Sequence, residues 1–205
     1  VIAMVTAVMI VMSGCQLKYI ASIIGIGLGG VAIIFPFIKD KLAEGFRSDR
    51  IEAWLDPWKN PTGTSYQTIQ GLYAIGSGGL FGVGLGESKQ KYLYIPEAHN
   101  DFIFAIIAEE LGFIGCSIVL GLFSILIIRG IVIAIRAKDT FGSLIAIGIT
   151  ALIAIQVILN IAVVTNSIPN TGISLPFLSY GGSSIVILLA AMGVLLNISR
   201  TAKKI

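Results

Sequence analysis

The sequence predicts an all-α, polytopic transmembrane helix bundle with about five membrane segments. Of its 205 residues, 56% are hydrophobic and 12% are charged, and the mean hydropathy is +0.93. These values leave too little polar surface for a soluble globular protein. Several apolar runs reach the roughly 20 residues that cross the hydrocarbon core as a helix. The weak alternating pattern of membrane β-strands is missing from the sequence, so helices are the expected elements.

The first half of the chain has two apolar segments followed by a long polar loop. Residues 1–13 are apolar but too few to span a bilayer, which predicts that the chain opens partway through a membrane helix and that sequence upstream is missing. Residues 19–38 are long enough to cross. Residues 39–100 form a large loop, and a loop of this size inside a compact membrane domain is usually functional.

Three further apolar runs follow and complete a single transmembrane domain over residues 1–205. Residues 101–135 would make about 50 Å of helix, which exceeds one bilayer, so we expect a break at Gly112. The part before the break would line a cavity, and the spanning part would begin at about Phe113. Residues 143–164 and 185–198 are the last two segments, and residues 165–184 form a second polar connection between them.

The basic residues at helix ends predict the orientation, because Lys and Arg in short connections favour the cytoplasmic side. If the segments alternate, Lys18, Arg136, Lys138 and Arg200 all lie on one side, which should be cytoplasmic. Loops 39–100 and 165–184 then share the extracellular face. The net charge of +3 comes with no basic cluster interleaved with aromatic residues, so nucleic acid is not an expected partner.

Asp101 is the strongest candidate for a catalytic residue. It closes a short polar cluster at the boundary between the large loop and an apolar helix, EAHND over residues 97–101. One interpretation is a helix cap, because Asp and Asn at a helix start accept backbone hydrogen bonds. Asn100 can fill that role, which would leave Asp101 available for chemistry.

Two more carboxylates, Glu109 and Glu110, lie at membrane depth. An ionised side chain there costs several kcal/mol unless it faces protein, water or a partner. Adjacent helix residues point about 100° apart, so we expect one to face the cavity and the other an Arg, a Lys or a backbone donor. A structural contact between loop and helix is the alternative to a direct role.

The remaining polar and small residues have more ordinary interpretations. His99 is the one histidine and has no Cys or second His nearby, so a hydrogen-bonded structural imidazole competes with an acid–base role, and a zinc site is not expected. The two cysteines are expected to be buried hydrophobes. Gln156 and Asn160 share a helix face and should form hydrogen bonds between helices. The glycine run over residues 71–86 matches no phosphate loop, and a flexible flap over a lipid headgroup is the expectation.

Five motifs together form a specific pattern: WLDPW at 54–58, YQ at 66–67, AIGSGGLFGVGLGESKQK at 74–91, IPEAHNDFIFAIIAEELGFIG at 95–115 and PNTGISLPFLSYGGSS at 169–184. On these residues the chain resembles the SEDS family (shape, elongation, division and sporulation), the peptidoglycan glycosyltransferases typified by FtsW, RodA and SpoVE. The resemblance implies a partial copy, about the second half, of a ten-helix fold. The sequence of residues 90–101, QKYLYIPEAHND, is more similar to the FtsW/SpoVE branch than to the RodA branch.

The resemblance implies a lipid II polymerase that serves cell division, shape or sporulation. Asp101 matches the family's essential acidic residue and would accept the proton of the incoming sugar hydroxyl, which attacks the anomeric carbon of the lipid-diphosphate donor with inversion. The leaving diphosphate needs positive charge, from Arg50 and Lys91 or from a divalent cation such as Mg²⁺ or Mn²⁺. The other candidate substrate-binding residues are Glu97, His99 and Glu109.

The resemblance also implies the partners and the location. The expected partners are lipid II, undecaprenyl diphosphate, membrane lipid, a transpeptidase of the class B penicillin-binding type and other membrane proteins of the division machinery. The expected location is the bacterial cell membrane, with the site on the extracellular face. Two alternatives remain open, a lipid II flippase that uses intramembrane carboxylates beside a polar cavity and a non-catalytic scaffold of the division machinery.

Overall fold

The computed structural model describes residues 1–14, 46–63, 65–90 and 99–202, and in these ranges it contains helices and no strand. The described elements are α1 (Ile2–Met12), α3 (Phe46–Leu55), the short 3₁₀ helix η1 (Pro57–Lys59), α4 (Tyr66–Gly78), α5 (Ile103–Arg136), α6 (Thr140–Val164) and α7 (Gly182–Thr201). The predicted all-α class is therefore confirmed for the described part of the chain. The segment expected over residues 19–38 lies outside it.

Helices α5, α6 and α7 are each long and apolar enough to cross a membrane, and α1 is a shorter apolar helix. Helix α6 begins three residues before the predicted start at residue 143. The Asp139 side chain explains this start, because its carboxylate accepts a hydrogen bond from the Gly142 backbone N–H at 2.7 Å. An aspartate at this position satisfies a backbone donor that would otherwise lack a partner.

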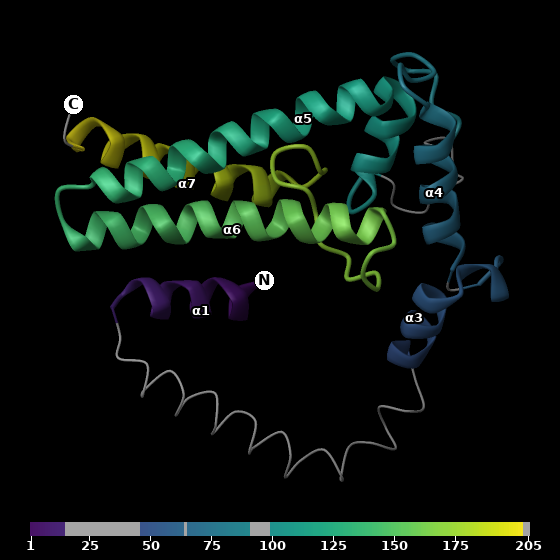
Figure 1. Cartoon of the computed structure of the whole chain (residues 1–205), viewed down its shortest axis with the longest axis horizontal. Coiled ribbons are helices and arrows are strands. Elements are labelled where there is room, and N and C mark those ends of the chain that lie inside the picture. The colour runs from purple at the N-terminus through teal and green to yellow at the C-terminus, as the bar shows by residue number, and fades with distance from the viewer. Residues whose placement is uncertain (15–45, 64, 91–98, 203–205) are drawn as a thin grey trace, which may run out of the picture.

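The long helices pack side by side. Helix α6 lies along α5, with α1 and α7 also packed against it, while α4 crosses one end of this bundle (Figure 1). A close contact between α5 and α6 occurs at Gly130, where a Cβ atom would lie 2.2 Å from the Thr150 hydroxyl oxygen. Small residues at such contacts let membrane helices approach closely.

Helix α5 is interrupted at Gly112, as predicted. Gly112 has φ 65° and ψ −165°, which is not a helical conformation, and the residues on both sides of it are helical. A positive φ favours glycine because it has no Cβ atom. The short part of α5 before Gly112 therefore runs in a different direction from the long part that follows (Figure 1).

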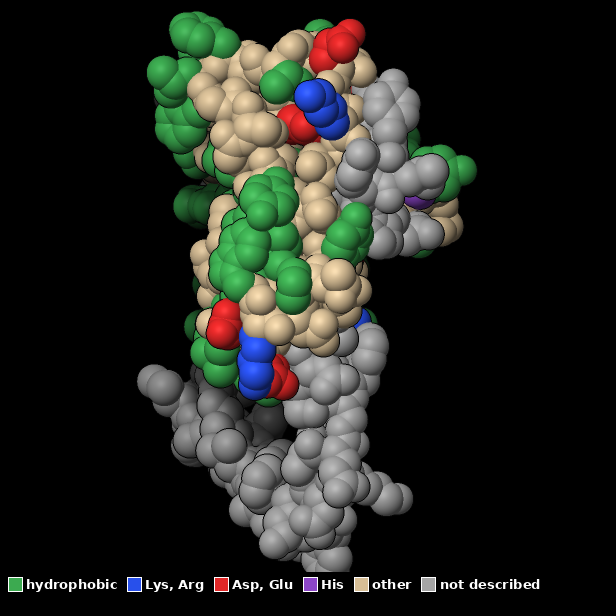
Figure 2. All heavy atoms as spheres, turned by 90° about the vertical axis from the view of Figure 1, so that its right-hand side faces the viewer, with side chains coloured by type: hydrophobic (Ala, Val, Ile, Leu, Met, Phe, Trp, Pro, Cys, Tyr) green, Lys and Arg blue, Asp and Glu red, His purple; other side chains and the backbone are tan. Residues whose placement is uncertain are grey.

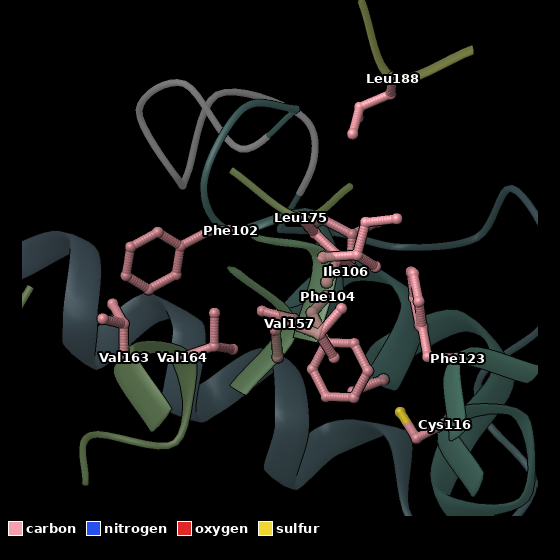
Figure 3. Packing of buried hydrophobic residues seen from close by; sticks show 14 residues of the cluster. Phe102, Phe104, Ile106, Cys116, Phe123, Val157, Val163, Val164, Leu175 and Leu188 are labelled. Carbon is pink, nitrogen blue, oxygen red and sulfur yellow. The ribbon is translucent and has the colours of Figure 1, made fainter. Parts of the chain in front are cut away.

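The hydrophobic core is concentrated where the start of α5 meets α6. Phe102 is fully buried on the side of Val163 and Val164, and Phe104 lies near Val157 (Figure 3). The Phe102 ring also packs on α4 at Gly71, where a Cβ atom would lie 2.8 Å from it. This packing fixes the position of the residue next to Asp101.

The loop predicted over residues 39–100 is partly helical, since it contains α3, η1 and α4. Viewed from the side of α3 and α4, acidic and basic side chains gather in two places with apolar side chains between them (Figure 2). On the membrane helices, by contrast, large apolar side chains such as Leu122 and Ile135 are exposed. The end that carries α3 and α4 thus has the charge expected of a surface outside the hydrocarbon.

Candidate functional site

Asp101 lies just before α5, in contact with two other parts of the chain. It is half-buried, and α5 begins at Ile103 with Phe102 at the N-cap position, so Asp101 does not start the helix itself. Its Oδ1 atom accepts a hydrogen bond from Gln67 Nε2 at 3.4 Å. Its backbone carbonyl accepts one from Asn160 Nδ2 at 2.7 Å. Both the side chain and the backbone of Asp101 are therefore held.

Asn160 joins two loops from within α6. It is fully buried, and the same Nδ2 group that reaches the Asp101 carbonyl also donates to the Ile173 carbonyl at 2.7 Å. A buried amide is stable only when it forms hydrogen bonds. We expected Asn160 to bond between helices, and the structure shows that its partners are carbonyls of the segments beside α5 and before α7. One side chain therefore sets how far apart these two segments lie.

A chain of polar contacts connects Asp101 to the segment before α7. Gln67 Oε1 accepts from Asn170 Nδ2 at 3.2 Å, and Asn170 Oδ1 accepts from the Gly172 backbone N–H at 3.0 Å. Arg50, on α3, donates through a guanidinium nitrogen to the Asn170 carbonyl at 3.0 Å. Gly172 has φ 65°, and a Cβ atom there would lie 3.8 Å from Asp101 Oδ2. Segments far apart in the sequence thus meet at this carboxylate.

A polar pocket of about 150 Å³ opens beside Gln67. It is lined by Arg50, Ala53, Trp54, Gln67, Thr68, Asn166 and Asn170. Its wall is fastened by a reciprocal pair, in which the Trp54 ring nitrogen donates to the Asn166 carbonyl at 3.0 Å and the Asn166 side chain donates to the Trp54 carbonyl at 3.3 Å. An arginine, an indole ring and several amides form a lining suited to a polar or phosphorylated group.

His99, two residues before Asp101, contacts the segment before α7. Its imidazole is exposed and packs edge-on against the Tyr180 ring, with centroids 5.5 Å apart. Its carbonyl accepts a hydrogen bond from the Tyr180 backbone N–H at 2.8 Å. These contacts fasten the residues before Asp101 to the segment before α7, so the structure gives His99 a place in the framework of the site.

Glu109 lies away from this network and holds a different loop. Its carboxylate is 2% exposed and accepts hydrogen bonds from the Ser88 hydroxyl at 2.5 Å and from the backbone N–H groups of Lys89 and Gln90 at 3.2 and 3.3 Å. Of the two alternatives for this residue, these contacts are those of the structural one, in which the carboxylate fastens a loop to the helix. The donors are a hydroxyl and two backbone amides rather than a cation.

The glycine run is packed rather than open where it meets α5. A Cβ atom on Gly78 would lie 1.9 Å from the Ala108 carbonyl oxygen, and one on Gly82 would lie 2.1 Å from the Glu110 carbonyl oxygen. Backbone hydrogen bonds also cross this contact, from Val83 to the Glu109 carbonyl at 2.9 Å and from Phe113 to the Gly79 carbonyl at 2.9 Å. Residues 78–83 therefore form a closely packed support for the kink in α5. This corrects the expectation of a flexible flap for this part of the run.

The structure brings together some of the predicted residues and adds others. Arg50 joins the network of Asp101 through the Asn170 carbonyl, and His99, two residues before Asp101, contacts Tyr180. Glu109 fastens another segment, and Lys91 and Glu97 are outside the described residues. Sequence reasoning assigned no role to Gln67, Asn170 or Gly172. All three stand within the motifs that carry the family resemblance, YQ and PNTG, which is the signal that could have indicated them.

The described residues do not converge on a metal. Across ranges 1–14, 46–63, 65–90 and 99–202, no group of three or more His, Cys, Asp or Glu side chains is placed to hold an ion. Among the exposed charges of α3 and η1, Lys59 pairs with Glu52, and this hydrogen-bonded carboxylate raises the pKa of the Lys59 ammonium. Arg50 is the cation that the structure places at the polar pocket.

Comparison with known sequences places this chain among cell cycle proteins. The family model of FtsW, RodA and SpoVE, described as "Cell cycle protein", matches residues 1–204. Stage V sporulation protein E of Bacillus subtilis is 53% identical over 196 residues, which cover 96% of this chain and 52% of that protein. The probable peptidoglycan glycosyltransferase FtsW of Trichlorobacter lovleyi is 48% identical over 203 residues, covering 98% and 51%. The chain thus spans about half the length of these curated relatives.

Two solved structures are similar to this chain in fold. One is a chain from a study entitled "Structural coordination of polymerization and crosslinking by a peptidoglycan synthase complex", with a TM-score of 0.69 and 27% identity, covering 98% of this chain and 54% of that chain. The other is an aspartate-to-alanine mutant of the Thermus thermophilus rod shape determining protein RodA, with a TM-score of 0.50 and 32% identity, covering 66% and 41%. This chain, a multi-pass membrane protein by its apolar helices, belongs to the FtsW/RodA/SpoVE family.

Proposed function

We propose that the protein containing this chain polymerises peptidoglycan glycan strands from lipid II, with Asp101 as the general base. The observation that carries the proposal is the carboxylate of Asp101, which is half-buried and held next to a polar pocket that also contains Arg50. The relatives named peptidoglycan glycosyltransferase FtsW support the reaction class. Since those relatives are about twice as long, the proposal concerns the protein of full family length.

In this mechanism Asp101 accepts the proton from the attacking sugar hydroxyl. The hydroxyl oxygen forms a bond to the anomeric carbon of the second lipid-linked sugar, and the bond from that carbon to the diphosphate breaks with inversion. Arg50, which lines the same pocket as Gln67, would oppose the negative charge of the leaving diphosphate. A divalent cation such as Mg²⁺ or Mn²⁺, carried on the diphosphate, is the alternative source of this positive charge.

The proposal places this site on the extracellular face of the cell membrane. The basic residue Arg136 ends α5 and Lys138 lies in the short turn before α6, at the opposite end of those helices from Asp101 (Figure 1). Positive charge in a short loop favours the cytoplasmic side. We propose lipid II as substrate, undecaprenyl diphosphate as by-product and a class B penicillin-binding transpeptidase as partner, which agrees with the complex of polymerization and crosslinking that the chain resembles.

The test is polymerisation of purified lipid II by the full-length protein in liposomes. Asp101→Asn should insert normally but lose about 100-fold or more of the activity, in the range that a general base contributes. Asp56→Asn, at an exposed aspartate after α3, is the matched control and should keep wild-type activity. Retained polymerisation by Asp101→Asn would reject the assigned base.

Two further measurements, one in these liposomes and one in cells, separate the two alternative functions. A flippase would move the lipid II headgroup across the liposome membrane without making polymer. A scaffold would let Asp101→Ala complement a deletion strain as well as the wild-type protein does. Either result would overturn the polymerase proposal.

A further inference from the structure

We propose that Gln67 is a positioning residue for Asp101, which holds one carboxylate oxygen through an amide whose orientation is fixed by Asn170. The inference rests on the proposed function, since it concerns how the base is prepared for its task. Gln67 touches the carboxylate at Oδ1, at 3.4 Å, and lines the polar pocket next to it. Its role would therefore be to orient the base rather than to take the proton.

The order of donors and acceptors fixes which end of the Gln67 amide faces Asp101. The network ends at the Gly172 backbone N–H, which can only donate, so the atom of Asn170 that meets it must be the oxygen. The Asn170 nitrogen then points to Gln67 and donates to its oxygen. That leaves the Gln67 nitrogen, a donor, facing the Asp101 carboxylate. A reversed Gln67 amide would put oxygen against oxygen at Asp101 and nitrogen against nitrogen at Asn170.

Each end of this network is fastened to the fold. Arg50 donates to the Asn170 carbonyl at 3.0 Å, which holds the backbone that carries the Asn170 side chain. At the other end, Gly71 stands four residues after Gln67 on α4, and the buried Phe102 ring packs directly on it. Because Phe102 is the neighbour of Asp101, this contact sets the distance between α4 and the carboxylate. The packing of Phe102 against α4 therefore brings Gln67 within hydrogen-bond distance of Asp101.

A neutral amide donor at this position has a clear electrostatic effect. A hydrogen bond to an ionised carboxylate favours the ionised form, which is the form that acts as a base. Gln67→Glu has nearly the same shape but replaces the donor with a second carboxylate, so the two acids would compete for one proton. Gln67→Met also has a similar shape and only removes the donor. Arg50, which lines the pocket, and His99, two residues before Asp101, are present in every variant.

The experiment measures the ionisation of Asp101 directly and then its activity, in the full-length protein in liposomes. A carbodiimide with an amine probe labels protonated carboxyl groups, and mass spectrometry of the peptide that contains Asp101 gives labelling against pH. Gln67→Glu should move the midpoint for Asp101 upward by about one pH unit or more, and Gln67→Met should move it upward by less. Gln70→Glu, three residues further along α4, adds the same charge outside the network and should leave the midpoint unchanged.

The polymerisation rate should follow the same pattern. On the acid limb of the profile Gln67→Glu should be about 10-fold slower or more, and its rate should recover as the pH is raised, since this limb moves with the ionisation of the base. A merely structural loss would lower the rate equally at every pH. Gln70→Glu should keep the wild-type profile.

Two outcomes distinguish this inference from the proposed function. If the labelling midpoint of Asp101 is unchanged in both Gln67→Glu and Gln67→Met, Gln67 does not act on the carboxylate and the inference is overturned. If the midpoint moves as expected but the wild-type protein makes no polymer, the contact is supported and the polymerase proposal is rejected.

Discussion

The Ser88 hydroxyl donates a hydrogen bond of 2.5 Å to Glu109 Oε2, and this contact fastens the loop after α4 to the first part of α5. The acceptor is a fully buried carboxylate that also receives two backbone N–H groups. Hydrogen bonds to a charged group are stronger than those between neutral groups. The loop is therefore held by one side chain that reaches it from the helix.

Removing this carboxylate should destabilise the protein. Glu109→Ala leaves the Ser88 hydroxyl and two backbone donors without their acceptor, and each buried donor without a partner costs about 1–3 kcal/mol. We expect the free energy of unfolding to fall by about 3 kcal/mol, and the thermal midpoint, followed by tryptophan fluorescence in detergent, to fall with it. Glu87→Ala, at an exposed carboxylate of the same loop, should change neither. Equal midpoints for the two variants would contradict the anchoring role.

Two glycines on α4 should respond in opposite ways to alanine. At Gly78 the new Cβ atom would lie 1.9 Å from the Ala108 carbonyl oxygen, so the backbone must move, at a cost of about 1–3 kcal/mol. At Gly76 nothing lies within 4 Å, and alanine should stabilise the helix by up to about 1 kcal/mol. Thermal unfolding of the two variants measures the difference, and a Gly78→Ala protein as stable as Gly76→Ala would show that the close contact is not present.

Two amides on one face of α6 should differ as well. Asn160→Leu removes the donor to the carbonyls of Asp101 and Ile173, and we expect a loss of about 2–3 kcal/mol together with lower activity. Gln156→Leu removes a buried oxygen that has no hydrogen-bond partner, so it should cost less than about 1 kcal/mol. Unfolding in denaturant and polymerisation assays on both variants test this, and the prediction fails if Gln156→Leu is the more damaging change.

Helix packing in the membrane gives a fourth matched pair. Gly130→Ala would bring a Cβ atom within 2.2 Å of the Thr150 hydroxyl oxygen and should separate α5 from α6 locally, at a cost of about 1–3 kcal/mol. Gly121→Ala, on the same helix, meets no atom within 4 Å and should be tolerated. Crosslinking between cysteines introduced into the two helices would report the separation. Identical crosslinking in both variants would argue against this contact.

The sequence predicted the features that depend on length and local chemistry. The break at Gly112 follows from an apolar run too long for one bilayer and from a residue that tolerates positive φ. That Asn160 forms hydrogen bonds follows from the cost of an unpaired amide in a membrane helix, although its partners are carbonyls outside the helices and the Gln156 oxygen has no partner. Both predictions could be made without information on which segments lie next to each other in space.

The parts that the sequence did not predict depend on distant contacts. Gln67 and Asn170 are 103 positions apart, and nothing in either local pattern shows that they meet. We expected Gly78 and Gly82 to make the loop mobile, because the sequence shows that glycine has a flexible backbone. The sequence does not show that backbone carbonyls of α5 pack against these two glycines. The sequence did not predict helices α3 and α4, because they lie in a stretch whose overall composition is polar.

The turn between α5 and α6 is a suitable place to insert a reporter protein. It lies at the far end of the bundle from every contact made by Asp101, and the Asp139 cap restarts the chain as helix immediately afterwards (Figure 1). A fluorescent protein or an affinity tag inserted after Ala137 would leave both the cap and the site intact. Such a reporter would follow the protein in living cells, and it would read out on which side of the membrane this turn resides.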